Sequence, residues 1–154
     1  MKKVIFEQTG NIISVLLLIA SSIEFISTFK VDNYNFEIYF GIFTFALIAW
    51  IPCFIIARLI YSKFDKNYNI KKGEYSATDE REVIIYYKSS LGAYKAIVFS
   101  LLIFFVAITL LAAFSNSMSF NNIHLGIISM LFFGFSIIVG LLTYLRIWLF
   151  LYLK

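Results

Sequence analysis

Four apolar stretches constrain this chain more than any other feature, because each is long enough to cross a lipid bilayer. Their approximate bounds are residues 11–29, 36–61, 94–114 and 123–145. At about 1.5 Å per residue, a helix of roughly 20 residues spans a hydrocarbon core of about 30 Å. Charged residues make up only 14% of the chain, against about 25% in a soluble domain. The sequence therefore predicts an all-α, polytopic membrane protein whose four transmembrane helices form two antiparallel hairpins in one domain, residues 1–154.

One long polar loop, residues 62–93, separates the two predicted hairpins. Every lysine and arginine except Lys30 lies in this loop or flanks a span on the same side of the membrane. Basic residues that flank spans are retained in the cytoplasm, so we expect the loop and both termini to be cytoplasmic. The net charge of +4 is explained by this topology, and we expect no nucleic-acid partner.

Few residues of the chain could carry enzyme chemistry. Cys53 is the only cysteine and His124 the only histidine, which excludes an internal disulfide and leaves no pair of residues at metal-binding spacing. The sequence also lacks a glycine-rich phosphate loop, a nucleophile elbow and an HExxH motif. We therefore expect no enzyme, no catalytic residue, no cofactor and no metal.

Glu24 is the only acidic residue well inside a predicted span. An ionisable group in a membrane is costly unless it is paired or hydrated, so it is a candidate coupling or binding residue. Glu24 lies only about 8 Å from the outer end of its helix, where it could also reach water or pair with Lys30. We favour this structural interpretation, under which Glu24→Gln is silent or slightly stabilising.

The segment IASSIEFISTFK resembles the first helix of small multidrug-resistance transporters. The matching residues are Glu24, Ser27, Thr28 and Lys30. The resemblance implies proton-coupled export through Glu24. The chain departs from that family in its long central loop, since those transporters have tight loops throughout.

The segment ATDEREVIIYYKSS resembles the loop of small bacterial four-helix membrane proteins that carry an Asp-Glu-Arg-Glu signature. The matching residues are Asp79, Glu80, Arg81 and Glu82. The resemblance implies a multi-pass protein of the bacterial inner membrane and no particular activity. Asp79 with Glu82 also approximates a capping box, which predicts a helix that starts there and continues into the third span.

The start of this helix has two distinct rows of side chains. Arg81, Lys88 and Lys95 recur at seven-residue spacing and form a basic row. The spacing of a second, apolar row is typical of a packed seam, at Ile84, Tyr87, Leu91 and Tyr94. The combination favours contact with the bilayer and its anionic lipid headgroups, and the alternative is a docking site for a protein partner.

Small residues predict where the third and fourth helices meet. Gly92, Ala96 and Ser100 recur every four residues, and Ser136 with Gly140 form a similar strip on the fourth helix. Small side chains let membrane helices approach closely, so we expect contact between these strips. The alternative is that one strip faces another helix or a second protomer in a homo-oligomer.

These observations favour a non-enzymatic membrane protein that acts through association. It would be an accessory subunit, an immunity or stress protein, or a membrane regulator. The alternative is an oligomeric proton-coupled exporter of small molecules that uses Glu24. An enzyme that acts on lipid ranks third, because the sequence lacks a catalytic set.

Overall fold

The computed structural model contains four long helices and one small β-hairpin. It describes residues 2–28, 30–32, 35–37, 40–73, 79–115 and 122–154. The helices are α1 (Lys2–Thr28), α2 (Ile42–Phe64), α3 (Glu80–Ser115) and α4 (Asn122–Leu153), and strands β1 (Lys30–Asp32) and β2 (Asn35–Glu37) pair antiparallel. The side chains of Lys30 and His124, to which the sequence drew attention, lie outside this description.

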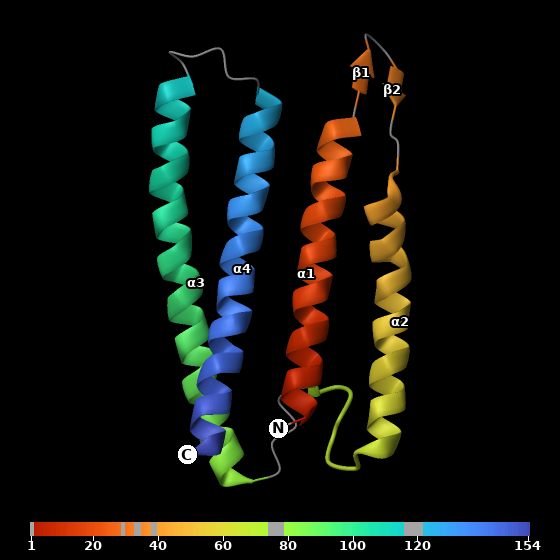
Figure 1. Cartoon of the computed structure of the whole chain (residues 1–154), viewed down its shortest axis with the longest axis vertical. Coiled ribbons are helices and arrows are strands. Elements are labelled where there is room, and N and C mark those ends of the chain that lie inside the picture. Colours follow the sequence, from red (N-terminus) through yellow and green to blue (C-terminus); the bar gives the residue numbers. More distant parts are fainter. Residues whose placement is uncertain (1, 29, 33–34, 38–39, 74–78, 116–121) are drawn as a thin grey trace.

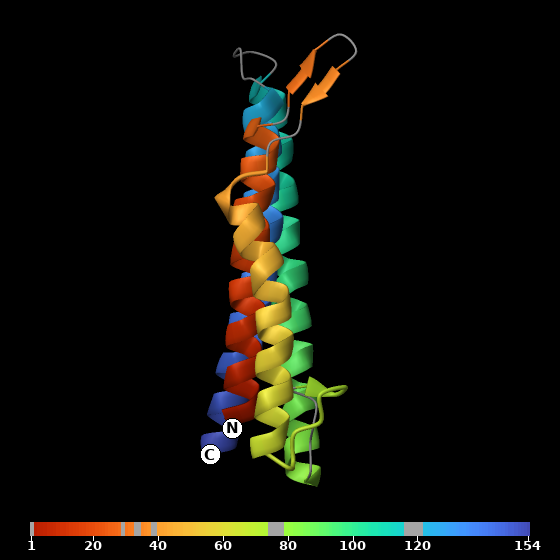
Figure 2. The same cartoon turned by 90° about the vertical axis from the view of Figure 1, so that its right-hand side faces the viewer.

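The helices form a flat row rather than a closed bundle. α3 packs on α4, α4 on α1, and α1 on α2. Figure 1 shows this order across the molecule, and Figure 2 shows the row edge-on. Each helix is long and apolar enough to span a membrane, so the chain is a four-span integral membrane protein by length and composition.

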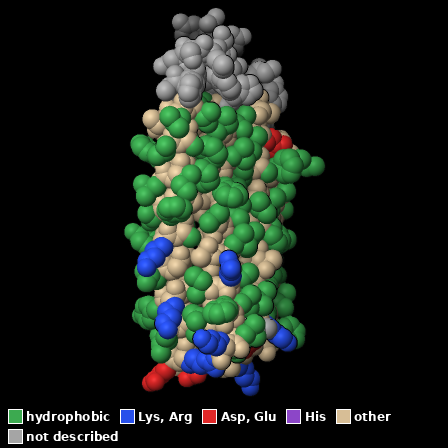
Figure 3. All heavy atoms as spheres, turned by 60° about the vertical axis from the view of Figure 1, so that its left-hand side comes forward, with side chains coloured by type: hydrophobic (Ala, Val, Ile, Leu, Met, Phe, Trp, Pro, Cys, Tyr) green, Lys and Arg blue, Asp and Glu red, His purple; other side chains and the backbone are tan. Residues whose placement is uncertain are grey.

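The two ends of the row differ in what they carry. Both termini and the connection between α2 and α3 lie at one end, here called the loop end. The β1–β2 hairpin lies at the opposite end, here called the hairpin end. In the face drawn in Figure 3, lysine and arginine side chains gather toward the loop end, and hydrophobic side chains are spread over the described surface.

The helix boundaries differ from the predicted spans where polar residues extend a helix or where a strand replaces it. α1 begins at Lys2 rather than near residue 11, and α4 continues to Leu153. α2 begins at Ile42 and not near residue 36, because residues 35–37 pair with residues 30–32 in the hairpin. α3 begins after Asp79, as predicted, and the Val83 N–H donates to the Asp79 carbonyl at 3.1 Å.

α1 and α2 meet along an antiparallel seam. Gly10 faces the ring of Phe54 so closely that any added Cβ would overlap it. One turn further along α1, the Ser14 hydroxyl accepts a hydrogen bond of 2.9 Å from the Trp50 indole N–H. The missing side chain at Gly10 therefore lets the helices approach until an indole and a hydroxyl meet in an apolar environment.

α4 makes close contacts on both of its sides. Gly134 faces Ile19 of α1, and Gly140 faces Ile97 of α3, each without room for a Cβ. Gly92 of α3 meets Ile147 in the same way. Among the other members of the two predicted strips, Ala96 is half-buried, whereas Ser100 and Ser136 are buried.

Candidate functional site

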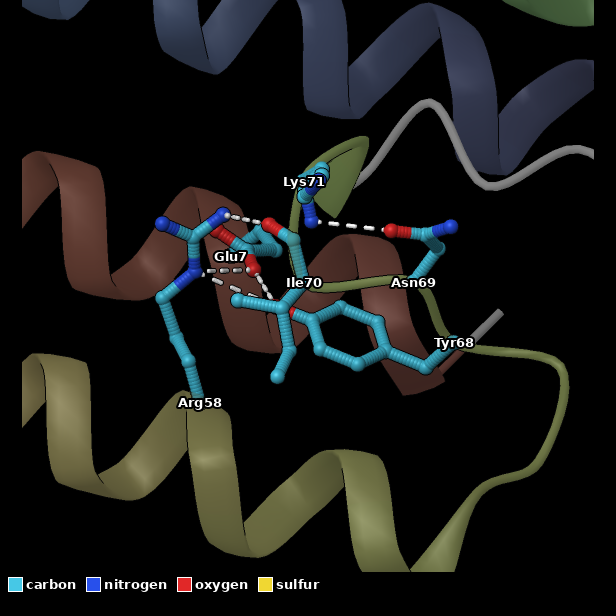
Figure 4. A network of polar contacts seen from close by, with 6 residues as sticks. All are labelled: Glu7, Arg58, Tyr68, Asn69, Ile70 and Lys71. Atoms are coloured by element: carbon cyan, nitrogen blue, oxygen red, sulfur yellow. Dashed lines mark hydrogen bonds and ion pairs between the residues drawn. The ribbon is translucent and has the colours of Figure 1, made fainter.

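The most connected polar site lies at the loop end, between α1, α2 and the segment that follows α2 (Figure 4). The Glu7 side chain is only 3% exposed. Its carboxylate accepts a hydrogen bond from Arg58 Nε at 2.8 Å and another from the Tyr68 hydroxyl. Arg58 Nε also lies 3.1 Å from the Tyr68 oxygen. A buried carboxylate is costly unless it is paired and hydrogen-bonded, and this arrangement meets both conditions.

The same arginine fixes the backbone of the loop. Arg58 Nη2 donates to the Ile70 carbonyl at 3.2 Å. The loop then turns at Gly73, which has a φ of +55°. A Cβ at Gly73 would lie 2.8 Å from Arg58 Nη2, so this position requires glycine both for its left-handed backbone and for its close approach to the guanidinium.

The electrostatics of the site hold Tyr68 in its neutral form. Burial of the phenol, followed by its hydrogen bond to Glu7, raises the pKa of Tyr68 to about 12. A neutral Tyr68 phenol can donate a hydrogen bond to the Glu7 carboxylate, whereas a Tyr68 phenolate would repel this carboxylate because both groups are anions. The site is therefore suited to hold the loop against α1 and α2.

A second contact joins α1 to the start of α3. Lys3 Nζ lies 2.9 Å from a carboxylate oxygen of Glu82. Beside this ion pair, a small apolar core brings three helices together at Val4, Ile85, Tyr144 and Trp148. Trp148, at 2% exposed, lies within this core and is buried inside the protein.

The packed face of α3 is not the apolar row that the spacing indicated. Ile84, Tyr87, Leu91 and Tyr94 are each more than half exposed. The residues of this segment that pack inward instead include Ile85 and Ser89, which are buried. The apolar row is therefore largely exposed within the described part of the chain, because helical spacing identifies a face but not which neighbour covers it.

The basic row lies on the exposed surface beside this apolar row. Arg81, Lys88 and Lys95 are all exposed. Arg81 Nη2 comes within 3.4 Å of the Tyr152 carbonyl at the end of α4. The two rows therefore lie side by side on α3 and are largely exposed in the described part of the chain.

α3 is longer than a membrane crossing requires. It has 36 residues, or about 54 Å at 1.5 Å per residue, against a core of about 30 Å. Part of the helix therefore extends past a membrane boundary.

Glu24 lies near the hairpin end of α1 and contacts α2. One oxygen of its carboxylate accepts hydrogen bonds from the backbone N–H groups of Phe43 at 3.1 Å and Thr44 at 3.2 Å, and from the Thr44 hydroxyl at 3.3 Å. Gly41 leaves room for this side chain, since a Cβ there would overlap the carboxylate. Glu24 therefore caps the N-terminus of α2 from a neighbouring helix.

Sequence reasoning did not identify the Glu7–Arg58–Tyr68 site. A signal was present, because Glu7 and Arg58 have opposite charges near the same end of two helices joined as an antiparallel hairpin. Tyr68 carried no comparable signal, since its place depends on the path of the loop.

Comparisons of the chain with protein-family models, with curated proteins and with solved structures find no match. Functional inference therefore depends on the geometry of the chain itself.

Proposed function

We propose that this is a non-enzymatic membrane protein that acts by associating with a protein partner through the exposed surface at the start of α3. This surface, here called the α3 face, consists of Ile84, Tyr87, Leu91 and Tyr94 together with Arg81, Lys88 and Lys95. In the proposed orientation, the loop end with both termini is cytoplasmic, because nearly all of the basic residues lie there.

The observation that carries this proposal is that large apolar and basic side chains lie exposed side by side at the start of α3. Tyr87 is 67% exposed and Tyr94 is 66% exposed. An exposed apolar patch bordered by charged residues is typical of an interaction surface. Tyrosine and arginine are also enriched among the residues that dominate protein interfaces.

The interactions beneath the α3 face support a fixed docking surface. The Lys3–Glu82 ion pair and the apolar core around Ile85 and Trp148 hold the start of α3 against α1 and α4. A rigid surface loses little conformational entropy when it binds. The position of the α3 face therefore suits recognition of a partner at the membrane surface.

The geometry gives less support to export through Glu24. Three hydrogen bonds to α2 occupy one oxygen of its carboxylate. The flat row of helices in Figures 1 and 2 also forms no ring around a central pathway. Export would require a second copy of the chain to enclose a pathway. It would also require the Glu24 carboxylate to leave its hydrogen bonds with the N-terminus of α2.

Photo-crosslinking in intact cells tests the proposal. A photoreactive phenylalanine analogue in place of Tyr87 should give a crosslinked product that contains a second protein. The matched control replaces Phe64, which is 86% exposed and lies at the loop end of α2, on the opposite edge of the row. Phe64 should give no such product.

Two outcomes would contradict association through the α3 face. One is crosslinking of Tyr87 to lipid alone, which would leave this face as a headgroup contact. The other is equal crosslinking to protein from Tyr87 and Phe64, which would show contact without preference for the α3 face.

A further inference from the structure

The loop after α2 forms an open pocket with no assigned role. The pocket lies between Ser62, in the last turn of α2, and loop residues 66–71, and its volume is about 610 Å³. It lies on a different element from the α3 face. Lys66 and Lys71 both line it, so two basic side chains border the pocket.

The charges around this pocket do not cancel. Among the described residues, neither Lys66 nor Lys71 has an ion-pair partner. Glu7, the nearby buried acid, is already paired with Arg58. Asp65 is close in sequence, and its carboxylate accepts the Asn67 N–H at 3.0 Å. The pocket therefore combines two cations with few competing anions.

The backbone that carries the lysines is ordered before any ligand binds. Asn69 Oδ1 accepts the Lys71 N–H at 2.9 Å, and the Asn69 carbonyl accepts from Lys72 and Gly73. The Tyr68 hydroxyl anchors the same segment on Glu7. Because the loop is already folded, little of its conformational entropy would be lost when a ligand binds.

The position of the pocket selects the class of ligand. α2 has 23 residues, about 35 Å of helix, so its last turn lies near the edge of a hydrocarbon core of about 30 Å. A pocket beside Ser62 is then at the depth of lipid phosphates. The Ser62 hydroxyl donates to the Leu59 carbonyl, and Asn67 also lines the pocket.

We propose that this pocket binds the phosphate group of an anionic membrane lipid, held by Lys66 and Lys71. Lysine binds phosphate as a compact point charge, and a basic residue near an anionic bilayer surface contributes about 1 kcal/mol to attraction. The site is independent of the α3 face, so either proposal can fail without the other.

The test measures thermal unfolding of the full-length protein in neutral detergent. Phosphatidylglycerol should raise the unfolding temperature more than phosphatidylcholine does. In Lys66→Gln/Lys71→Gln this difference should fall by more than half. The control Lys2→Gln/Lys154→Gln removes the same charge from exposed positions at the same end and should keep the full difference. Lys66→Arg/Lys71→Arg should restore it.

Three results would overturn the proposal. One is an equal response of the wild-type protein to both lipids, and another is an equal loss in the two Gln double variants. The third is stabilisation by inorganic phosphate alone that matches phosphatidylglycerol, which would assign the pocket to a soluble phosphate compound. Native mass spectrometry of bound lipid gives a second measurement, which does not depend on the stability of each variant.

Discussion

The carboxylate of Glu24 shows how an ionisable side chain can be accommodated inside a membrane span. The first backbone N–H groups of a helix have no partner within that helix and carry partial positive charge. Glu24 supplies an anion to those groups in α2. The interaction ties α1 to α2 at the hairpin end, where residues 30–32 and 35–37 of the connection pair as a small β-hairpin.

Glu24→Gln should lower the free energy of unfolding by about 0.5–1 kcal/mol, because the amide keeps an acceptor but loses the charge at the helix terminus. The sequence alone favoured a silent or slightly stabilising substitution. The contact between Glu24 and the N-terminus of α2 predicts a destabilising one instead. Thermal unfolding in detergent measures the change. Ser27→Ala is the control, since Ser27 bonds only within α1. An unfolding temperature at or above that of wild type would argue against the cap.

Tyr68 makes the loop end sensitive to alkaline pH. Its pKa in the folded protein is about 12, against about 10 in an unfolded chain. Because the folded state holds the phenol proton more tightly, the stability from this group is complete below about pH 10 and is lost as pH rises toward 12.

Tyr68→Phe isolates this effect from the other tyrosines. Wild type should be more stable than the variant at neutral pH, because the variant leaves Glu7 with one hydrogen bond fewer. The difference in unfolding temperature should shrink as pH rises above about 10. A difference that stays constant through the alkaline range would show that Tyr68 does not titrate in this way.

At the scale of elements, glycine positions determine how closely the helices approach. Gly140 lies against Ile97 at the α3–α4 contact, whereas Gly126, on the same helix, has no neighbouring atom within 4 Å of an added Cβ. The two glycines therefore form a matched pair. Membrane helices associate largely through such packing, because lipid removes the hydrophobic drive between them.

Gly140→Leu should destabilise the protein by about 1–3 kcal/mol through overpacking, and Gly126→Leu should have a much smaller effect. Thermal unfolding of both variants in the same detergent gives the comparison. Equal effects at the two positions would mean that the α3–α4 contact tolerates separation at Gly140.

At the scale of the whole molecule, the flat row exposes both of its faces. α2 has no buried residue in the structure, and its apolar surface suits contact with lipid tails. The ion pairs between described residues, Lys3–Glu82 and Glu7–Arg58, lie at the loop end. The Glu24 carboxylate joins α1 to α2 at the hairpin end, and close helix packing holds the row along its length.

The proposed orientation can be tested with two exposed positions at opposite ends. In a Cys53→Ala background, Lys72→Cys should be labelled only after the membrane is made permeable. Phe40→Cys, at a residue that is 60% exposed, should be labelled in intact cells. Lys72 is preferable to Gly73 because a side chain at Gly73 would contact Arg58. The reverse labelling pattern would invert the orientation and place the α3 face outside the cytoplasm.

The sequence by itself determined the class of this protein. Apolar stretches of membrane-spanning length leave the backbone polar groups no partner except their own helix, so four helices followed from length and composition alone. The local sequence around Asp79 likewise predicted where α3 begins, because helix starts depend largely on nearby residues. The basic residues predicted an orientation by the same local reasoning.

Only the tertiary structure decided which polar groups meet. Glu7 is far in the chain from Arg58 and Tyr68, and no local pattern indicates that the loop after α2 returns to the start of α1. The spacing of Ile84, Tyr87, Leu91 and Tyr94 indicated a helix face but not whether it is covered. The contact between Glu24 and the N-terminus of α2 similarly depends on how α1 and α2 are aligned along their lengths. Local physics sets the elements, whereas contacts between them depend on long-range packing that one stretch of sequence does not encode.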